Sequence, residues 1–162
     1  MKHIKTYEQN IGITFQEWLS SKNESPINTT VINCGISNLI DLNGIEKFKN
    51  LKELYCRNNK LTSLPDLNQL KNLKFLYCEN NKLTSLPDLN QLKNLKELYC
   101  YDNKLTSLPD LSQLKNLKYL YCQNNKLPYG DLYGYFEWLD QYIIDNPNSP
   151  EAINHNINKY NI

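Results

Sequence analysis

The sequence predicts a single α/β domain in which stacked repeat units form a solenoid with a parallel sheet, closed by helices at both ends. Three observations support this prediction. A unit of about 22 residues recurs five times in phase between residues 29 and 128. Within each unit, apolar and polar residues alternate over a stretch too short to bury its apolar side alone. The flanking segments, residues 1–28 and 129–162, show helical patterns instead.

The segment before the array, residues 1–28, is predicted to form a helical cap. Residues 14–17, Thr-Phe-Gln-Glu, match a capping box, a pattern that typically begins a helix. Phe15, Trp18 and Leu19 would share one side of that helix. Because an open solenoid exposes an apolar end and unpaired strand edges, we expect this segment to cover the first turn.

The repeat array follows, and its units align in register. The second and third units differ only where Glu53 is replaced by Phe75 and Arg57 by Glu79. Each unit contains a short strand with inward-facing apolar residues, such as Leu54. Stacked copies would form a parallel sheet whose inner side is covered by further leucines of the same turn. The units are residues 29–50, 51–72, 73–94, 95–116 and, in part, 117–128.

Each unit reads LxxLxCxxNxLxxLPxLxxLxx, which resembles the 22-residue class of the leucine-rich repeat family, with Cys in the third leucine position. The match covers about three fifths of the chain, and similar arrays occur in bacterial and giant-virus proteins. The resemblance implies a right-handed solenoid with a concave parallel sheet and a short irregular or 3-10 convex side. It also implies a ladder of buried asparagines that end the strands and bond to backbone of neighbouring turns. These are Asn59, Asn81, Asn103 and Asn125; Ser37 replaces the asparagine in the first unit, where we expect weaker turn definition.

One cysteine recurs in every unit, and we interpret the column as core. The cysteines would lie on the inner side, one inter-strand spacing of ~4.8 Å apart, and Cys is among the most buried residue types. Thiols that all point one way do not converge tetrahedrally on a metal ion. Neighbours in one parallel sheet also do not aim their Cβ atoms at each other, as a disulfide requires. We therefore expect no metal site, disulfide or cofactor at Cys34, Cys56, Cys78, Cys100 and Cys122.

The segment after the array, residues 129–162, is predicted to form a second helical cap. Asp131 is a candidate N-cap, and Asn146-Pro147 would end the helix that follows. A final helix would begin at residues 149–151 and carry further apolar residues. Trp18 and Trp138 both lie in cap segments, and we interpret them as covering the ends of the core. The apolar residues at helical spacing are Leu132, Tyr135, Phe136, Leu139, Tyr142 and Ile143, and in the final helix Ile153, Ile157 and Tyr160.

The units vary mainly in two columns of outward-facing strand positions on the predicted concave face. Buried and turn positions hardly change between units, so the concave face is predicted to recognise a partner. A column of tyrosines that offer large contact area at low entropy cost runs between the variable columns. Alternatively, these tyrosines form a self-stacking ladder that stabilises the sheet, and both roles can hold together. The predicted partner-binding residues are Glu53, Tyr55, Arg57, Phe75, Tyr77, Glu79, Glu97, Tyr99, Tyr101, Tyr119, Tyr121 and Gln123.

Charge leaves two further functions open. The chain has a net charge of +1, but residues 47–126 contain 14 basic and 7 acidic residues, a net charge of +7. Columns of lysines could attract a polyanion, either an acidic protein or a nucleic acid, or could be a solvated rim. The third alternative is a purely structural array without a fixed ligand.

Several function classes lack sequence support. The chain has no Gly-rich phosphate-binding loop or HExxH motif, and its two histidines, His3 and His155, lie at opposite ends. We therefore expect a non-catalytic module. The first residues lack the apolar run of a secretory signal, and no stretch approaches the ~20 apolar residues of a membrane span. We expect a cytoplasmic, intracellular monomer that binds another protein rather than a nucleic acid or a membrane.

Overall fold

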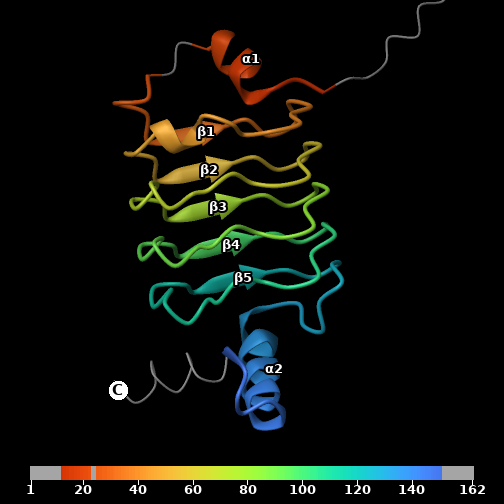
Figure 1. The fold of residues 1–162 in the computed structure, drawn as a ribbon. Helices are drawn as coiled ribbons and strands as arrows, with labels where there is room; N and C mark the ends of the chain where they lie inside the picture. The colour runs from red at the N-terminus through yellow and green to blue at the C-terminus, as the bar shows by residue number, and fades with distance from the viewer. Residues whose placement is uncertain (1–11, 23–24, 151–162) are drawn as a thin grey trace, which may run out of the picture.

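The structure, a computed structural model, describes residues 12–22 and 25–150 of the chain. Figure 1 shows a single stack of turns, with α1 (Phe15–Ser20) at one end and α2 (Leu132–Asp145) at the other. Between them, five short strands pair in chain order, and every pair is parallel. The predicted parallel solenoid is confirmed. The strands are β1 (Val31–Asn33), β2 (Glu53–Tyr55), β3 (Phe75–Tyr77), β4 (Glu97–Tyr99) and β5 (Tyr119–Tyr121).

Neighbouring strands pair without offset, so each repeat position forms a straight column across the sheet. Phe75 lies opposite Glu53 on one side and Glu97 on the other. The hydrogen-bond ladder continues beyond the strand ends, since the N–H of Cys56 donates to the carbonyl of Tyr77 at 2.8 Å. A 22-residue period and a zero offset together place equivalent residues of neighbouring units side by side.

The inner side of the sheet forms the core. The leucines that precede the tyrosines, such as Leu54 and Leu76, are buried, as are most leucines of the return segments. All five cysteines are fully buried with free thiols, which confirms their predicted place in the core. In the unit of residues 51–72, one buried cysteine thus packs among six buried leucines.

The convex side is short and irregular, as predicted. Only the first of the described units contains a 3-10 helix, η1 (Ile45–Lys47). Later units make single 3-10-type turns, in which the N–H of Leu70 donates to the carbonyl of Leu67 at 2.8 Å. The carboxylate of Asp66 accepts the N–H of Asn68 at 2.8 Å and fixes the approach to this turn.

The hydrogen bonds of the predicted asparagine ladder are confirmed, but only Asn59 is buried, whereas Asn81, Asn103 and Asn125 are half-buried. The amide of Asn59 donates to the carbonyls of Cys34 and Cys56 at 2.9 and 3.0 Å, and its oxygen accepts the N–H of Leu39 at 2.9 Å. Asn81, Asn103 and Asn125 repeat these contacts. The prediction that the asparagines end the strands was wrong, because β2 already ends at Tyr55.

The chain between strand and ladder asparagine passes through a left-handed residue in every turn. In the later turns this is Asn58, Asn80, Asp102 or Asn124, with φ between 52 and 56°. Asn and Asp tolerate this conformation better than most residues. The first turn differs, because both Ile36 and Asn38 have positive φ, at 57 and 61°.

Both caps contain the expected local signals. Thr14 and Glu17 form the predicted capping box, and Phe15 packs edge-on against Phe48 with ring centroids 6.2 Å apart. At the other end, Asp131 accepts the N–H of Gly134 at 2.9 Å as the N-cap of α2.

The apolar side of α2 covers the last turn only in part as predicted. Tyr135 and Leu139 are buried, but Phe136 is exposed, so its predicted place in the cap core was wrong. The N–H of Leu111 donates to the Tyr135 hydroxyl at 3.3 Å and joins the helix to the last return segment. The predicted helix carrying Ile153, Ile157 and Tyr160 lies outside the described residues. No helix in residues 12–22 or 25–150 is both long enough and apolar enough to cross a bilayer.

Candidate functional site

The candidate site is the outer, concave face of the sheet. We define the concave face by three columns that run from β2 to β5 and the residues just beyond them. Straight pairing brings the members of each column together, as the sequence predicted. The columns are Glu53, Phe75, Glu97 and Tyr119; Tyr55, Tyr77, Tyr99 and Tyr121; and Arg57, Glu79, Tyr101 and Gln123.

The tyrosine column is a continuous aromatic stack. Ring centroids are 4.9 Å apart for Tyr55 and Tyr77, 4.4 Å for Tyr77 and Tyr99, and 4.7 Å for Tyr99 and Tyr121. The central pair is stacked and the outer two pairs meet edge-to-face. Such pairs contribute roughly 0.5–1.5 kcal/mol each beyond their burial. The tyrosines therefore stabilise the sheet, whatever else they contact.

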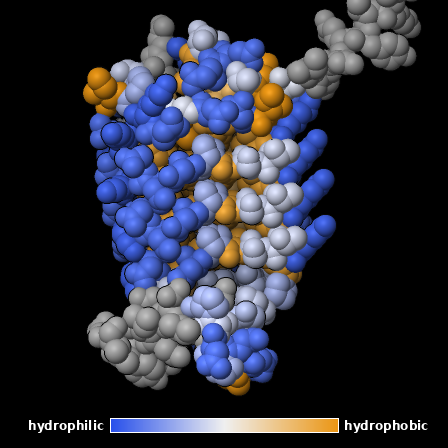
Figure 2. All heavy atoms as spheres, in the orientation of Figure 1, coloured by the Kyte–Doolittle hydropathy of each residue, from blue (hydrophilic) through white to orange (hydrophobic). Residues whose placement is uncertain are grey.

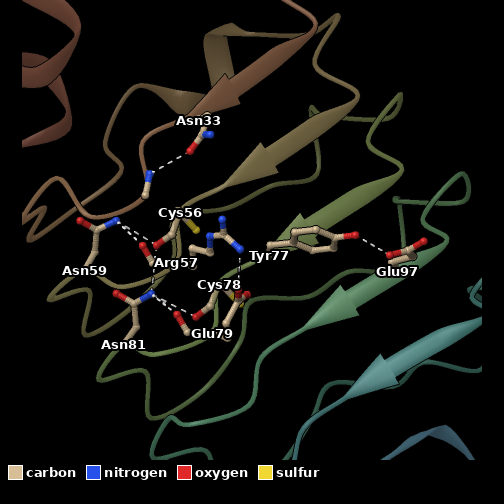
Figure 3. Close-up of polar contacts among 10 residues, drawn as sticks. Asn33, Cys56, Arg57, Asn59, Tyr77, Cys78, Glu79, Asn81 and Glu97 are labelled. Atoms are coloured by element: carbon tan, nitrogen blue, oxygen red, sulfur yellow. Dashed lines mark hydrogen bonds and ion pairs between the residues drawn. The ribbon is translucent and has the colours of Figure 1, made fainter.

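Two tyrosine hydroxyls bond to carboxylates of the adjacent column. The hydroxyl of Tyr55 donates to Glu53 at 2.7 Å. The hydroxyl of Tyr77 donates to Glu97 on the next strand, as Figure 3 shows. The bond to Glu53 raises the pKa of Tyr55 to about 12, with burial adding to the effect. These contacts fix the two carboxylates on the surface and occupy part of their hydrogen-bonding capacity.

Exposure on the concave face is greatest at its C-terminal end. Tyr119 is 51% exposed and Tyr121 39%, whereas Phe75 and Tyr77 are half-buried between neighbours. Strand β5 therefore presents two large aromatic side chains to solvent on a rigid backbone. Gln123 is exposed beside them.

One predicted contact residue lies in a different environment. Glu79 was predicted to be an outward-facing specificity residue, but it is only 2% exposed, so it cannot contact a partner directly while it stays in place. Its Oε1 lies 3.9 Å from Nη1 of Arg57, whose side chain is 50% exposed (Figure 3). Burial raises the pKa of the Glu79 carboxyl, and a hydrogen bond from its own backbone and the charge of Arg57 partly oppose this shift.

The margins of the stack are polar. Figure 2 shows stripes of like hydropathy that repeat from turn to turn, with hydrophilic side chains along both margins. The lysines contribute to these margins in columns just before the strands and just after the turns that follow them. The exposed members are Lys52, Lys96 and Lys118 before strands, and Lys82, Lys104 and Lys126 after them.

A second concavity, which the sequence did not predict, lies between the last return segment and α2. It is a cleft of about 380 Å³, lined by Leu108 and Pro109 on one side and by Tyr129, Trp138 and Tyr142 on the other. The available signal was the clustering of aromatic residues after residue 128, which also suits a cap. Residues 12–22 and 25–150 contain no group of three His, Cys, Asp or Glu side chains placed to hold a metal ion.

The repeat geometry matches a known family. A family model described as leucine-rich repeats, in two copies, matches residues 49–91 and 93–134, together more than half of the chain. The chain belongs to the leucine-rich repeat family. Leucine-rich repeats generally mediate protein–protein interaction, and the family is typically a non-catalytic scaffold.

Solved structures of other leucine-rich repeat proteins resemble this one. The functional domain of InlJ from Listeria monocytogenes, described as including a cysteine ladder, is 44% identical with a TM-score of 0.57 over 60% of this chain and 21% of its own. YopM from Yersinia enterocolitica is 26% identical with a TM-score of 0.58, over 71% of this chain and 28% of its own. A leucine-rich repeat protein of Leptospira interrogans is 34% identical with a TM-score of 0.51, over 64% of this chain and 33% of its own.

These relatives are much longer than the present chain. The chain spans between about a fifth and a third of the length of the three proteins. No match was found among the curated proteins.

Proposed function

We propose that this leucine-rich repeat protein is a non-catalytic module that binds another protein on its concave face. The observation that carries the proposal is the exposed aromatic pair on β5, where Tyr119 is 51% and Tyr121 39% exposed. Large, rigid aromatic side chains are enriched at binding hot spots because they lose little conformational entropy on binding. Leucine-rich repeats in general mediate protein–protein interaction, which supports the same conclusion.

The rest of the concave face would orient the partner. Glu53 and Glu97 are held by tyrosine hydroxyls, and Arg57 and Gln123 are exposed at the far margin. Charged groups at such margins mainly determine partner choice and association rate. We propose that the module acts as a monomer in an intracellular, reducing compartment, which the five free thiols support.

A capture experiment tests the proposal. Immobilised wild-type protein would be compared with Tyr119→Ser/Tyr121→Ser in native cell extract, with bound proteins identified by mass spectrometry. The matched control is Tyr133→Ser, which removes a tyrosine that is 74% exposed on α2 and lies outside the concave face. We expect a protein that wild type and control retain and the double variant loses by about tenfold or more. Identical profiles for all three proteins would contradict binding at β5.

A further inference from the structure

Glu79 has an environment that the fold does not require. Its carboxylate is buried, and its Oε2 has no hydrogen-bond partner. Its Oε1 lies 3.9 Å from Nη1 of Arg57. That distance is too long for a hydrogen bond. A hydrogen bond from the Glu79 backbone compensates burial only in part, since the pKa of the carboxyl stays raised. Taking a carboxylate out of water with so little compensation is unfavourable.

The other units show that this position accepts very different side chains. The column reads Gly35, Arg57, Glu79, Tyr101 and Gln123. The backbone is the same in the last three, because Asn80, Asp102 and Asn124 follow with nearly equal φ of 55, 52 and 56°. An unfavourable group at a freely variable position is expected where function, rather than folding, selected it.

The neighbours of Glu79 indicate what it does. Arg57 lies between Glu79 on one side and Gly35 on the other, and a Cβ at Gly35 would come within 3.3 Å of Arg57 Cγ. The absence of a side chain at Gly35 therefore leaves room for the Arg57 stem, while Glu79 attracts its guanidinium. A guanidinium has five N–H donors. Since Arg57 is half exposed, it presents donors to solvent from a restricted position.

Positive charges outnumber negative ones around the concave face, since residues 47–126 have a net charge of +7. Glu53 and Glu97 accept tyrosine hydroxyls, and Glu79 is buried. The exposed cations at and beside the strands are Arg57 and six lysines: Lys52, Lys82, Lys96, Lys104, Lys118 and Lys126.

The tyrosine stack favours a polypeptide over a single-stranded nucleic acid. Proteins that bind single strands stack bases on open aromatic faces. Here the ring centroids of neighbouring tyrosines lie 4.4–4.9 Å apart along the column, and Tyr55, Tyr77 and Tyr99 are half-buried, so three of the four rings do not offer an open face.

We propose that the concave face binds an acidic polypeptide segment, one carboxylate of which pairs with Arg57, and that Glu79 is the positioning residue for that guanidinium. This inference rests on the proposed function and names the chemistry of the partner. Arg pairs with carboxylates through two parallel N–H donors, so a guanidinium held in one position gains more than a mobile one.

Fluorescence anisotropy with labelled poly-L-glutamate tests the inference on the full chain. We expect binding that weakens with salt and falls about tenfold in Arg57→Ala, in line with the loss of charge-assisted hydrogen bonds. Lys71→Ala, which removes an exposed cation from a return turn, serves as the matched control and should change affinity less than about twofold. An equal loss in the control would overturn the assignment to Arg57.

The direction in which Glu79→Gln changes the affinity for poly-L-glutamate separates two roles of Glu79. If Glu79 only neutralised Arg57, the substitution would tighten polyanion binding. Because Glu79 positions Arg57, we expect Glu79→Gln to weaken binding about threefold and to have no effect in an Arg57→Ala background. The double variant Arg57→Ala/Glu79→Gln removes both buried and exposed charge, so it keeps the test valid if Arg57→Ala alone is unstable. Tighter binding by Glu79→Gln would overturn the positioning role.

Two further results separate this inference from the proposed function. Tighter binding of oligo(dT) than of poly-L-glutamate, with the same dependence on Arg57, would replace the acidic polypeptide by a nucleic acid. If poly-L-glutamate does not bind at low salt while a captured protein is still lost in Tyr119→Ser/Tyr121→Ser, concave-face binding stands and the acidic partner is overturned.

Discussion

Tyr55 and Cys56 are neighbours in the chain, yet their columns run along opposite sides of the sheet. The cysteine column is fully buried and repeats in all five units. The tyrosine column also stacks from turn to turn, but its outer surface meets solvent and the columns beside it change in every unit. Packing therefore restricts which residue types the inner positions accept, but hardly restricts the outer ones. Inside, each turn offers the same small space, whereas outside the fold accepts Arg, Glu, Tyr or Gln at one position.

The largest expected difference between the two sides is chemical access to the thiols. Burial raises the pKa of Cys34 and Cys122 to about 12, and the thiolate is the reactive form. We expect thiol modification at pH 8 to be about a thousandfold slower in the folded protein than in denaturant, where all five cysteines should react. A reagent such as dithionitrobenzoate measures both rates. Rapid reaction of one native thiol would place that cysteine outside the core.

Removing a ladder asparagine should lower the stability of the folded protein strongly. Asn81 donates to the carbonyls of Cys56 and Cys78 at 3.0 Å and accepts the N–H of Leu61 at 3.0 Å. Asn81→Ala leaves these groups unpaired, so we expect the free energy of unfolding to fall by about 3 kcal/mol in urea denaturation.

The matched control for the asparagine ladder is Asn94→Ala. Asn94 makes an exposed bond to the carbonyl of Lys71 at 3.0 Å, and its loss should cost less than about 1 kcal/mol. Equal effects of the two substitutions would show that the ladder adds nothing beyond an ordinary surface bond.

Replacing the buried carboxylate should stabilise the protein, but only at neutral pH. The pKa of Glu79 is raised above its ordinary value of 4.5, chiefly by burial. Below that value Glu79 is protonated in both folded and unfolded chains; as the pH rises through the raised pKa, the folded protein loses the stability of the protonated form. We therefore expect Glu79→Gln to gain about 1 kcal/mol at pH 7 and nothing below about pH 4.5. A gain that is independent of pH would contradict a charge-based cost.

The outermost side chains should matter least for stability. Tyr119→Ser removes a half-exposed ring and should change the free energy of unfolding by less than about 0.5 kcal/mol. On the same strand, Leu120 is 2% exposed, and Leu120→Ala should cost about 3 kcal/mol. Thermal or urea unfolding measures both. A large effect of Tyr119→Ser would assign that tyrosine to the fold rather than to a partner.

Much of the fold could be read from the sequence because the repeat multiplies each local signal. The period fixed which residues stack, and the alternation of Leu54 and Cys56 with polar neighbours indicated the buried side. The ladder of Asn59 followed from the family resemblance. A second ladder was missed, in which Asn50, Asn72, Asn94 and Asn116 donate to backbone carbonyls of the preceding turn. Its asparagines lie on the surface, where the sequence pattern does not show whether a side-chain amide bonds to the backbone or only to water.

The error at Glu79 has a physical origin. A strand's alternation predicts whether a residue points inward or outward, but burial at the margin also depends on the side chains one turn above and below. Arg57 and Tyr101 flank Glu79 in its column. The Tyr55–Glu53 and Tyr77–Glu97 bonds were missed for the same reason, because a rotamer choice decides them. The residues of the concave face were predictable, whereas the contacts among them were not.

The straight register has a consequence for how such a molecule can change its dimensions. Because the strands pair without offset and the units are nearly identical, a further copy of residues 73–94 would meet junctions that it already fits on both sides. Each added or deleted copy between Arg57 and Tyr119 would change the separation of the cationic and aromatic groups by one strand spacing, ~4.8 Å. On the proposed binding surface, duplication of one unit would lengthen the span between Arg57 and Tyr119 by a fixed increment and would favour partners whose charged and apolar groups have the new spacing.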